Sequence, residues 1–300
     1  MDLHALNDQF AIGRHIAFAA GPGDLPVAEI RNGYATSTVA LHGAHVTAYR
    51  PHDQAPVLFV SRAAIYRAGT SIRGGIPVCW PWFAQHPADP ARPMHGFACT
   101  AMWRVLGTAV IDDATQLRLG LSDDETTRAI WPHPFALELV VTVGARLDAE
   151  LVARNTGDQP FTCGGALHTY FRVGDAAQIA IGGLDGCAYV DKVDAGQRKL
   201  QRGPVTIASE VDRIYLDTTA DCVIEDPTLG RRIRVVKSGS RTTVVWNPWA
   251  EKARAIADFQ PEEYLEMVCV ETANANTAGD AIAVAPGGEH RLRATIGVEP

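Results

Sequence analysis

Hydrophobic and polar residues alternate with a period of two along most of the chain, which is the pattern of β-strands with one buried face. No long segment shows the periodicity of an amphipathic helix, and short helical turns are expected only near residues 61–66 and 122–129. The expected strands cover residues 15–20, 36–41, 45–50, 57–60, 103–110, 116–121, 136–143, 149–154, 166–173, 178–181, 205–207, 222–225, 232–236, 242–246, 265–270 and 291–298.

Turn-forming sequences separate these segments. Asn32-Gly33, Asp226-Pro227 and Pro286-Gly287 supply the glycines, prolines and short polar side chains that tight turns require. Many short strands joined by turns are typical of a β-sandwich or barrel rather than of a parallel α/β sheet. Because no Pro/Ser-rich linker divides the chain and no fixed-period repeat occurs, we expect residues 1–300 to form one large all-β, antiparallel domain.

An acidic residue lies near the end of one of the clearest strands. Alternation places Met267, Cys269 and Glu271 on one face and Val268 and Val270 on the other. A carboxylate at the end of such an apolar face is partly desolvated, which raises its pKa towards the working range of a general base. The alternative is that Glu271 lies just past the strand and faces water.

A histidine occupies the middle of another expected strand. Alternation places Ala166, His168 and Tyr170 on one face of this segment. A histidine between apolar neighbours is expected to be buried, and its ordinary pKa of about 6.5 suits it to proton donation near neutral pH. The alternative is a structural histidine that is satisfied by a hydrogen bond in the core.

Three further residues are candidates for substrate binding. Arg73 precedes two glycines, where the backbone can approach a ligand closely, and could grip a carboxylate or phosphate. His95 stands in a loop that enters a strand, and Asp212 could accept hydrogen bonds from substrate hydroxyls. The plainer alternatives are a solvated arginine, an exposed or structural histidine, and an aspartate that pairs with Arg213 or caps a turn.

Composition is that of an ordinary soluble globular protein, with 47% hydrophobic and 20% charged residues. The net charge of -7, without a concentrated Lys/Arg tract, argues against a nucleic-acid partner. Six scattered cysteines without a C-x-x-C pair indicate free thiols of a reducing compartment. The first ten residues lack the pattern of a signal peptide, and no apolar stretch approaches the ~20 residues of a membrane span, so we expect a cytoplasmic protein with no membrane partner.

Motifs for several other chemistries are missing from the sequence. It contains no Gly-x-Ser-x-Gly elbow and no P-loop. His86, His95, His133 and His168 show no metal-ligand spacing such as H-E-x-x-H, although a metal site assembled from distant strands stays open.

Several stretches, taken in order, resemble the glucose-6-phosphate 1-epimerase branch of the aldose 1-epimerase (mutarotase) family. Each piece is weak alone, but six or more in the family's order are a specific signal, and together they span roughly residues 60–271. The matching pieces are IRGGIP and CWP within residues 72–81, HGFA at 95–98, ALHTYF at 166–171, GL at 183–184, YVDKV at 189–193, DRIY at 212–215, VWNP at 245–248 and MVCVE at 267–271.

The resemblance implies a galactose mutarotase-like β-sandwich that acts on a sugar without metal or organic cofactor, and we expect a monomer. It implies that Glu271 is the general base that takes the proton of the anomeric hydroxyl, and that His168 is the general acid that protonates the ring oxygen. The ring then opens to the aldehyde, C1–C2 rotates, and the ring closes on its other face with the roles reversed. By the same resemblance, Asp212 and His95 contact or position the substrate and Arg73 contributes to a phosphate grip.

One position departs from the family pattern. The family commonly reads His-Gly-Phe-Ala-Arg, with the arginine serving the phosphate, but this chain has Cys99 there. Losing one charge-assisted hydrogen bond costs about 1.5–3 kcal/mol, or roughly ten- to a hundredfold in affinity, unless Arg62, Arg67, Arg92 or Arg104 compensates. We expect a mutarotase for D-glucose 6-phosphate or a related hexose 6-phosphate. The alternatives are a mutarotase for unphosphorylated aldoses and a sugar-phosphate-binding protein without turnover.

Overall fold

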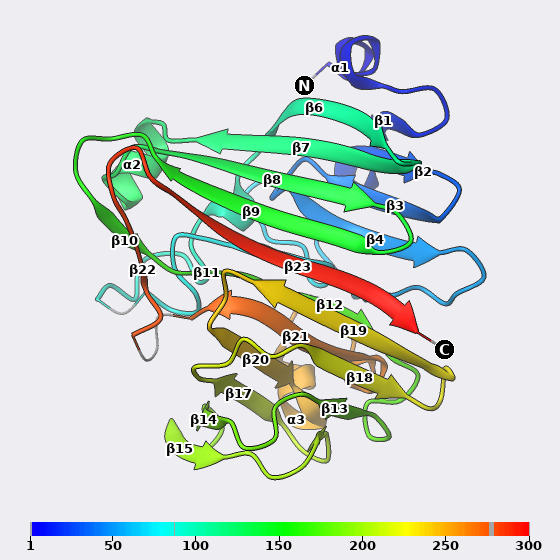
Figure 1. Cartoon of the computed structure of the whole chain (residues 1–300), viewed down its shortest axis with the longest axis vertical. Coiled ribbons are helices and arrows are strands. Elements are labelled where there is room, and N and C mark those ends of the chain that lie inside the picture. Colours follow the sequence, from blue (N-terminus) through cyan, green and yellow to red (C-terminus); the bar gives the residue numbers. More distant parts are fainter. Residues whose placement is uncertain (1, 87, 276–278, 300) are drawn as a thin grey trace.

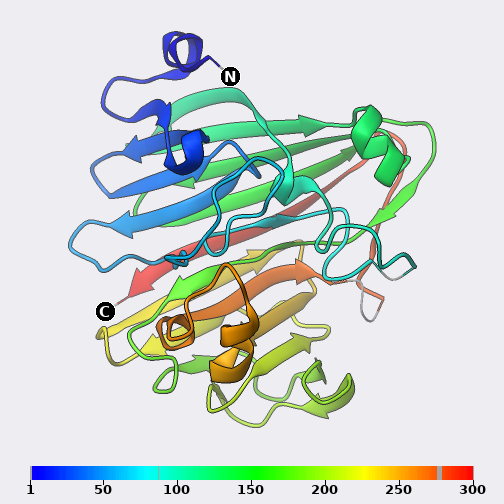
Figure 2. The ribbon, with the colours of Figure 1, turned by 180° about the vertical axis from the view of Figure 1, so that it is seen from behind.

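Antiparallel strands make up most of the regular structure of the protein (Figure 1). The computed structural model describes residues 2–86, 88–275 and 279–299. Two layers of strands face each other, which is clear when the views from the two sides are compared (Figures 1 and 2). The expected all-β sandwich is therefore confirmed.

One layer is a nine-stranded sheet in which every pair of neighbouring strands is antiparallel. In spatial order its strands are β16 (Val205–Thr206), β13 (Ala180–Gly182), β18 (Cys222–Asp226), β19 (Arg231–Ser238), β23 (Glu289–Glu299), β9 (Leu147–Asn155), β8 (Phe135–Val143), β7 (Ala114–Ser122) and β6 (Arg104–Ile111).

The opposite layer combines a four-stranded and an eight-stranded sheet, and a small two-stranded sheet lies beside them. The four-stranded sheet contains β1 (Ile16–Ala20), β2 (Pro26–Arg31), β3 (Ala35–Ala40) and β4 (His45–Pro51). The eight-stranded sheet runs β15 (Gln197–Leu200), β14 (Ala188–Asp191), β17 (Val211–Tyr215), β20 (Thr242–Asn247), β21 (Met267–Asn274), β11 (Gly165–Leu167) and β5 (Val78–Cys79), with β12 (Tyr170–Arg172) also paired to β21. The small sheet pairs β10 (Phe161–Cys163) with β22 (Ile282–Val284).

The main core lies between the two layers. A single cluster of buried residues joins Ile30 and Val46 of the four-stranded sheet, Val268 and Val270 of β21, and Leu139 of the nine-stranded sheet. Burying apolar surface of this kind is the main favourable contribution to folding. Because Val268 and Val270 take the core side of β21, the residues between them and after them project from the opposite face of that sheet.

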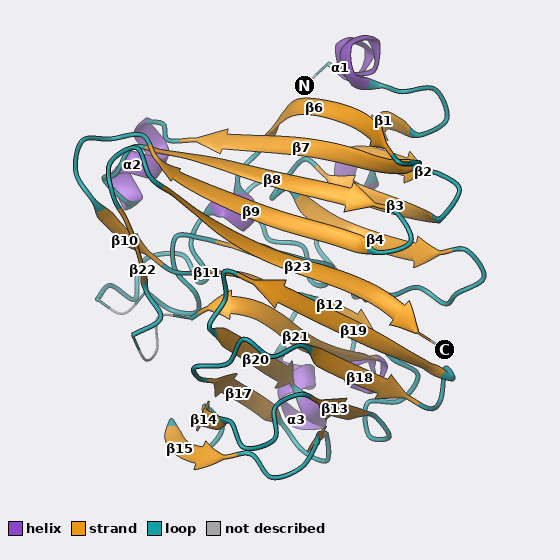
Figure 3. Ribbon diagram, in the orientation of Figure 1, coloured by secondary structure: helices purple, strands orange, loops and turns teal. Residues whose placement is uncertain are grey.

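Helices are few and short (Figure 3). They are α1 (Leu3–Phe10), α2 (Glu125–Ile130) and α3 (Trp249–Ala255), with 3₁₀ turns η1 (Pro22–Asp24), η2 (Ala98–Thr100) and η3 (Glu263–Glu266). Within the described ranges, no helix is long and apolar enough to cross a membrane.

Local differences from the sequence expectations have identifiable causes. The helical turn expected near residues 122–129 is present as α2, but the one expected near 61–66 is wrong, since this segment forms only a tight turn. The strand expected at 57–60 is reduced to isolated bridges from Leu58 to Phe171 and from Val60 to Gly74. The strand expected at 166–173 is divided into β11 and β12, and the two residues at the division include a candidate for catalysis.

Candidate active site

His168 and Glu271 lie opposite each other on neighbouring strands. Leu167 pairs with Thr272 and Tyr170 pairs with Cys269, so the same register sets His168 against Glu271 where the ladder is interrupted. The amide of His168 donates to the Pro77 carbonyl at 3.0 Å instead of joining the ladder. The structure thus brings together the two residues for which the sequence predicts proton transfer.

The two side chains are close and almost completely buried. Nδ1 of His168 lies 3.3 Å from Oε1 of Glu271, and the exposed fractions of the two residues are 9% and 1%. Their geometry is not that of a hydrogen bond, and both Nδ1 of His168 and Oε2 of Glu271 are buried without a hydrogen-bond partner. The alternative that Glu271 faces water is therefore excluded. Unpaired buried polar atoms are costly and mark places where a ligand can supply the missing partner.

Burial also sets the protonation of this pair. Desolvation raises the pKa of Glu271 well above its ordinary value, and the nearby carboxylate of Asp212 adds to the rise. Desolvation lowers the pKa of His168 well below its ordinary value, and His95 and Arg73 act in the same direction. Both effects favour the neutral form of each group, a protonated carboxyl and an imidazole with a single ring proton.

Arg73 is anchored at the edge of this pair by two side chains. Its Nε donates to Oδ1 of Asp258 at 3.1 Å, and its Nη1 donates to the hydroxyl of Tyr170 at 3.2 Å. The ring of Tyr170 stacks on the ring of His168 at 4.8 Å with an interplanar angle of 11°. The guanidinium is therefore connected through Tyr170 to the imidazole, while its charge is largely balanced by Asp258.

The two glycines after Arg73 have a different role from the one expected. Gly74 has a φ of 116°, and a Cβ there would lie 2.4 Å from the carbonyl oxygen of Phe59. Gly75 has a φ of 63°, and a Cβ there would lie 2.4 Å from the carbonyl oxygen of Val46. These glycines allow close packing of backbone on backbone, which fixes the loop that carries Arg73.

His95 is a neutral hydrogen-bonding group beside His168. The two ring centroids are 5.3 Å apart, and Nδ1 of His95 accepts a hydrogen bond from the amide of Ala84 at 3.1 Å. Burial lowers the pKa of His95 to about 4, with Arg73 contributing. The acceptor role of Nδ1 places the proton of the neutral ring on Nε2, which gives the site a donor.

Asp212 belongs to the same face of the sheet, one row away from Glu271. Asp212 pairs with Trp246, and Trp246 pairs with Cys269, so these residues form a row across β17, β20 and β21. Burial raises the pKa of Asp212, while Lys252 and Lys192 oppose the rise. Trp246, which the sequence analysis did not single out as a site residue, lies edge-on to the rings of both His168 and Tyr170.

A pocket of about 180 Å³ opens beside His168. Among the described residues that line this pocket, Arg73 is the one arginine or lysine. The four arginines that could have compensated for Cys99 do not line it. Arg62 contacts Glu263 and Glu266, and Arg67 contacts Thr70. Arg92 contacts Asp89 and His86, and Arg104 contacts Ser122. The lining residues are Ser71, Ile72, Arg73, Pro77, Cys79, Met94, His95, Cys99, His168 and Tyr170.

Cysteines are prominent around this site. All six cysteines of the chain are free, as the sequence analysis expected, and five of them are buried. Cys99 lines the pocket with 3% of its surface exposed, and burial raises the pKa of its thiol. One ligating atom each of His168, Cys269 and Glu271 lie within 4.8 Å of one another, which is a grouping that can hold a metal ion.

The chain resembles known proteins over nearly its whole length. The sequence model of the family described as aldose 1-epimerase matches residues 26–297. A protein of Salmonella typhimurium named "Putative glucose-6-phosphate 1-epimerase" is 36% identical over 274 residues, which is 91% of this chain and 90% of that protein. A protein of Escherichia coli with the same name is 36% identical over 241 residues, or 80% of each chain.

Solved structures agree with the sequence relatives. The crystal structure described as that of "a putative mutarotase (YeaD)" from Salmonella typhimurium has a TM-score of 0.89 and 32% identity, covering 96% of this chain and 95% of that one. The similarity therefore extends from local motifs to the complete arrangement of strands. The chain belongs to the aldose 1-epimerase family and is an isomerase of that family.

Proposed function

We propose that the protein interconverts the α and β anomers of an aldose, with Glu271 as general base and His168 as general acid. The observation that carries this proposal is the 3.3 Å approach of these two buried groups, each with an atom that has no hydrogen-bond partner. Two such atoms suit a sugar whose anomeric hydroxyl gives up a proton and whose ring oxygen receives one. General acid–base catalysis of this kind contributes about 10²–10⁴-fold in rate.

The cycle starts from the charged form of the pair, which differs from the neutral form that burial favours by one proton moved from Glu271 to His168. With Glu271 ionised and His168 protonated, the carboxylate takes the proton of the anomeric hydroxyl and the imidazolium protonates the ring oxygen as the ring opens. The open aldehyde then lies beside a neutral carboxyl and a neutral imidazole, the forms that burial favours for these groups. After rotation about C1–C2, reversed transfers close the ring on its other face and restore the starting forms.

Neighbouring residues supply binding and orientation. Stacking of Tyr170 on His168 holds the imidazole plane, and Arg73 holds Tyr170 through its hydroxyl. Asp212, on the same sheet face, is suited to accept hydrogen bonds from sugar hydroxyls, and Nε2 of His95 is suited to donate one. Trp246, which is half-buried on the same sheet face, is suited to pack against the apolar face of a sugar ring.

D-Glucose 6-phosphate or a related hexose 6-phosphate is the first candidate substrate. The names of the Salmonella typhimurium and Escherichia coli relatives support this choice, and so does the position of Arg73 in the pocket. Its guanidinium is the group in that lining with the geometry to hold a phosphate oxygen pair.

An unphosphorylated aldose is the second candidate, and one specific observation favours it. The charge of Arg73 is balanced by Asp258 at 3.1 Å, and the neighbouring pocket position is the uncharged Cys99. A phosphate dianion would therefore meet little net positive charge. Buried histidines with lowered pKa values add none near neutral pH.

The experiment is a direct comparison of substrates. Polarimetry or NMR exchange spectroscopy would follow the anomerisation of α-glucose 6-phosphate, α-glucose and α-galactose with and without the purified protein. We expect acceleration of at least one of them. Well-folded protein that accelerates none, but binds a sugar phosphate in calorimetry, would refute turnover and select a binding protein instead.

A further inference from the structure

Three side chains of different chemistry meet at one point of the sheet: the imidazole of His168, the thiol of Cys269 and the carboxylate of Glu271. We propose that this group is a binding site for a thiophilic divalent cation such as Zn²⁺, and that occupation of the site inhibits anomerisation. The inhibitory part of this inference rests on the proposed function, whereas the binding part does not.

Strand β21 and the short segment between β11 and β12 place the three groups. Cys269 and Glu271 are two residues apart on β21, so both project from the same face of the sheet. His168 stands opposite Glu271 on the neighbouring segment, and Tyr170 stands opposite Cys269. One ligating atom of each residue lies within 4.8 Å of the others.

These separations are close to those of a zinc site. Bond lengths of about 2.0–2.3 Å in a tetrahedral site put neighbouring ligand atoms about 3.3–3.8 Å apart. The nitrogen and oxygen of His168 and Glu271 are already 3.3 Å apart. Side-chain rotation that moves the sulfur of Cys269 by about 1 Å would bring it within bonding distance of an ion held by the other two groups. The fourth position would be open to water or to a ligand, as in many zinc sites.

Two buried atoms lack a partner that a cation would provide. Nδ1 of His168 and Oε2 of Glu271 are without a hydrogen bond in the structure. Both are acceptors when the imidazole is neutral with its proton on Nε2 and the carboxyl is ionised, and each can coordinate a metal. The same atoms are those proposed to exchange protons with the sugar, so cation and substrate compete for them.

The ligand set selects the kind of cation. Thiolate and imidazole ligands favour Zn²⁺ and similar ions, while Mg²⁺ and Ca²⁺ prefer oxygen ligands in larger number. Nearby charges act in both directions: Asp212 lies on the same sheet face and attracts a cation, whereas Arg73 repels one. The pairing of Arg73 with Asp258 reduces this repulsion. His168 lines the pocket, which provides a route from solvent.

Cobalt(II) is the probe, because its spectrum reports ligand type and geometry. The full chain, freed of metal with a chelator, would be titrated with Co²⁺ and followed by absorption. We expect saturation at one equivalent, with a thiolate-to-cobalt band in the near ultraviolet and intense visible bands of a tetrahedral ion, both removed by Zn²⁺. Absence of the thiolate band in the wild-type protein would overturn the proposed site.

Variants assign the band to its sulfur. Cys269→Ser should abolish the thiolate band and weaken Co²⁺ binding at least about tenfold, since one of three ligands is replaced by a poor one. Cys269→Ala provides a second variant in case a buried hydroxyl prevents folding. Cys222→Ser is the matched control, a buried strand cysteine of the other layer, and should keep the band. A band that survives both substitutions at position 269 would contradict the proposal.

Activity measurements test the inhibition separately. Each protein is compared with its own metal-free rate of anomerisation, and Zn²⁺ should reduce the wild-type rate in proportion to occupancy, with full recovery after addition of a chelator. For Cys269→Ser, the Zn²⁺ concentration that halves the rate should be at least about tenfold higher than for the wild-type protein. Cobalt binding without any effect on the rate would refute the inhibitory role. A protein without measurable anomerisation would refute the proposed function and leave the spectroscopic test intact.

Discussion

His168 and Glu271 are cross-strand neighbours, with Nδ1 and Oε1 3.3 Å apart, although more than a hundred residues separate them in the sequence. Strand pairing between β21 and the β11–β12 segment fixes this approach. A sheet is a rigid support, so the two groups are held in place before a substrate arrives. Preorganisation of this kind is what proton transfer within one bound substrate requires.

Replacement of the carboxylate gives the first prediction. Glu271→Gln preserves the shape of the side chain but removes the proton acceptor, so we expect the rate of anomerisation to fall by about 10²–10⁴-fold. Because Glu271 carries a raised pKa in a buried site, its neutral amide analogue should not lower the stability of the fold. Polarimetry measures the rate, and circular dichroism with urea unfolding measures the fold.

The matched control for this experiment is Glu138→Gln. Glu138 is another largely buried strand glutamate, but it lies on β8 in the opposite layer. Its replacement should leave the rate within about twofold of the wild-type value. An unchanged rate in Glu271→Gln, with correct folding, would refute the role of Glu271 as base.

Much of this arrangement was accessible from alternation along the chain. The period-two pattern correctly predicted that Met267, Cys269 and Glu271 share a face and that Val268 and Val270 occupy the other. Alternation does not specify which strand lies next to which, so the meeting of His168 with Glu271 came from the family resemblance rather than from the pattern. The pairing of Arg73 with Asp258 was likewise beyond reach, because Asp258 lies in a loop without periodicity.

Helices α1 and α3 were missed for a physical reason. In α1, Asp2 caps the helix and Leu3, Leu6 and Phe10 follow at helical spacing, but eight residues are too few for a strong periodic signal. In α3, the run after Trp249 contains good helix formers yet spans only seven residues. The expectations of one domain, of a monomer and of a cytoplasmic location stay predictions.

Substrate charge depends on the partner of Arg73, which gives a second prediction. Asp258→Asn removes the carboxylate that balances Arg73 but keeps a hydrogen-bonding group at the same place. We expect the ratio of kcat/KM for glucose 6-phosphate to kcat/KM for glucose to rise severalfold, because the charge of Arg73 is then available to the phosphate. The rise is limited by the free energy of one charge-assisted contact, about 1.5–3 kcal/mol. Measuring both substrates with one protein preparation cancels errors in active concentration. A ratio that falls or stays constant would show that Asp258 does not limit phosphate binding.

Acid should destabilise the fold through His45, which is the third prediction. His45 is fully buried, and its Nε2 lies 2.6 Å from the carbonyl oxygen of Gly74. Burial lowers the pKa of His45 to about 4, which the Gly74 bond opposes and His42 reinforces. Between pH 6.5 and pH 4 the unfolded chain therefore binds a proton that the folded protein excludes, so stability falls as the pH falls through this window.

The size of this effect follows from the two pKa values. From pH 7 to pH 5, His45 alone should lower the free energy of unfolding by about 2 kcal/mol, and His95, with a similar pKa, adds to the loss. In His45→Gln, whose amide can still donate to the Gly74 carbonyl, the fall between pH 7 and pH 5 should be about 2 kcal/mol smaller. Urea unfolding at both pH values measures it. Identical pH dependence in the variant and the wild-type protein would contradict this assignment.

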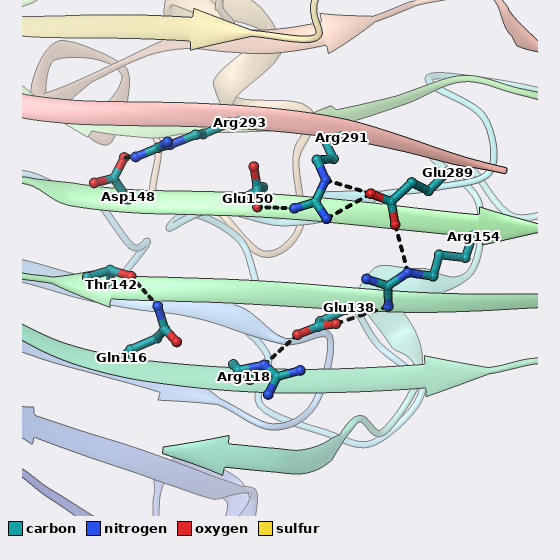
Figure 4. Close-up of polar contacts among 10 residues, drawn as sticks. All are labelled: Gln116, Arg118, Glu138, Thr142, Asp148, Glu150, Arg154, Glu289, Arg291 and Arg293. Carbon is teal, nitrogen blue, oxygen red and sulfur yellow. Dashed lines mark hydrogen bonds and ion pairs between the residues drawn. The ribbon is translucent and has the colours of Figure 1, made fainter. Parts of the chain in front are cut away.

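The outer face of the nine-stranded sheet carries a network of charged side chains that gives the fourth prediction (Figure 4). Glu138 accepts from Arg118 at 2.6 Å and from Arg154 at 3.2 Å, and only 8% of its side chain is exposed. Glu150 pairs with Arg291 at 3.0 Å, where the two side chains are 25% and 50% exposed.

Glu138 and Glu150 should contribute unequally to the stability of the fold, because water and ions screen an exposed ion pair more than a buried one. Glu138→Gln is expected to lower the free energy of unfolding by about 1–2 kcal/mol, since a largely buried acceptor loses two charge-assisted bonds. Glu150→Gln is expected to cost less than about 0.5 kcal/mol, as is usual for a single exposed pair. Added salt should reduce the small effect of Glu150→Gln further and change that of Glu138→Gln less, because partly buried pairs are screened less by ions. Equal effects of the two substitutions in urea unfolding would show that the network acts as one cooperative unit rather than as separate pairs.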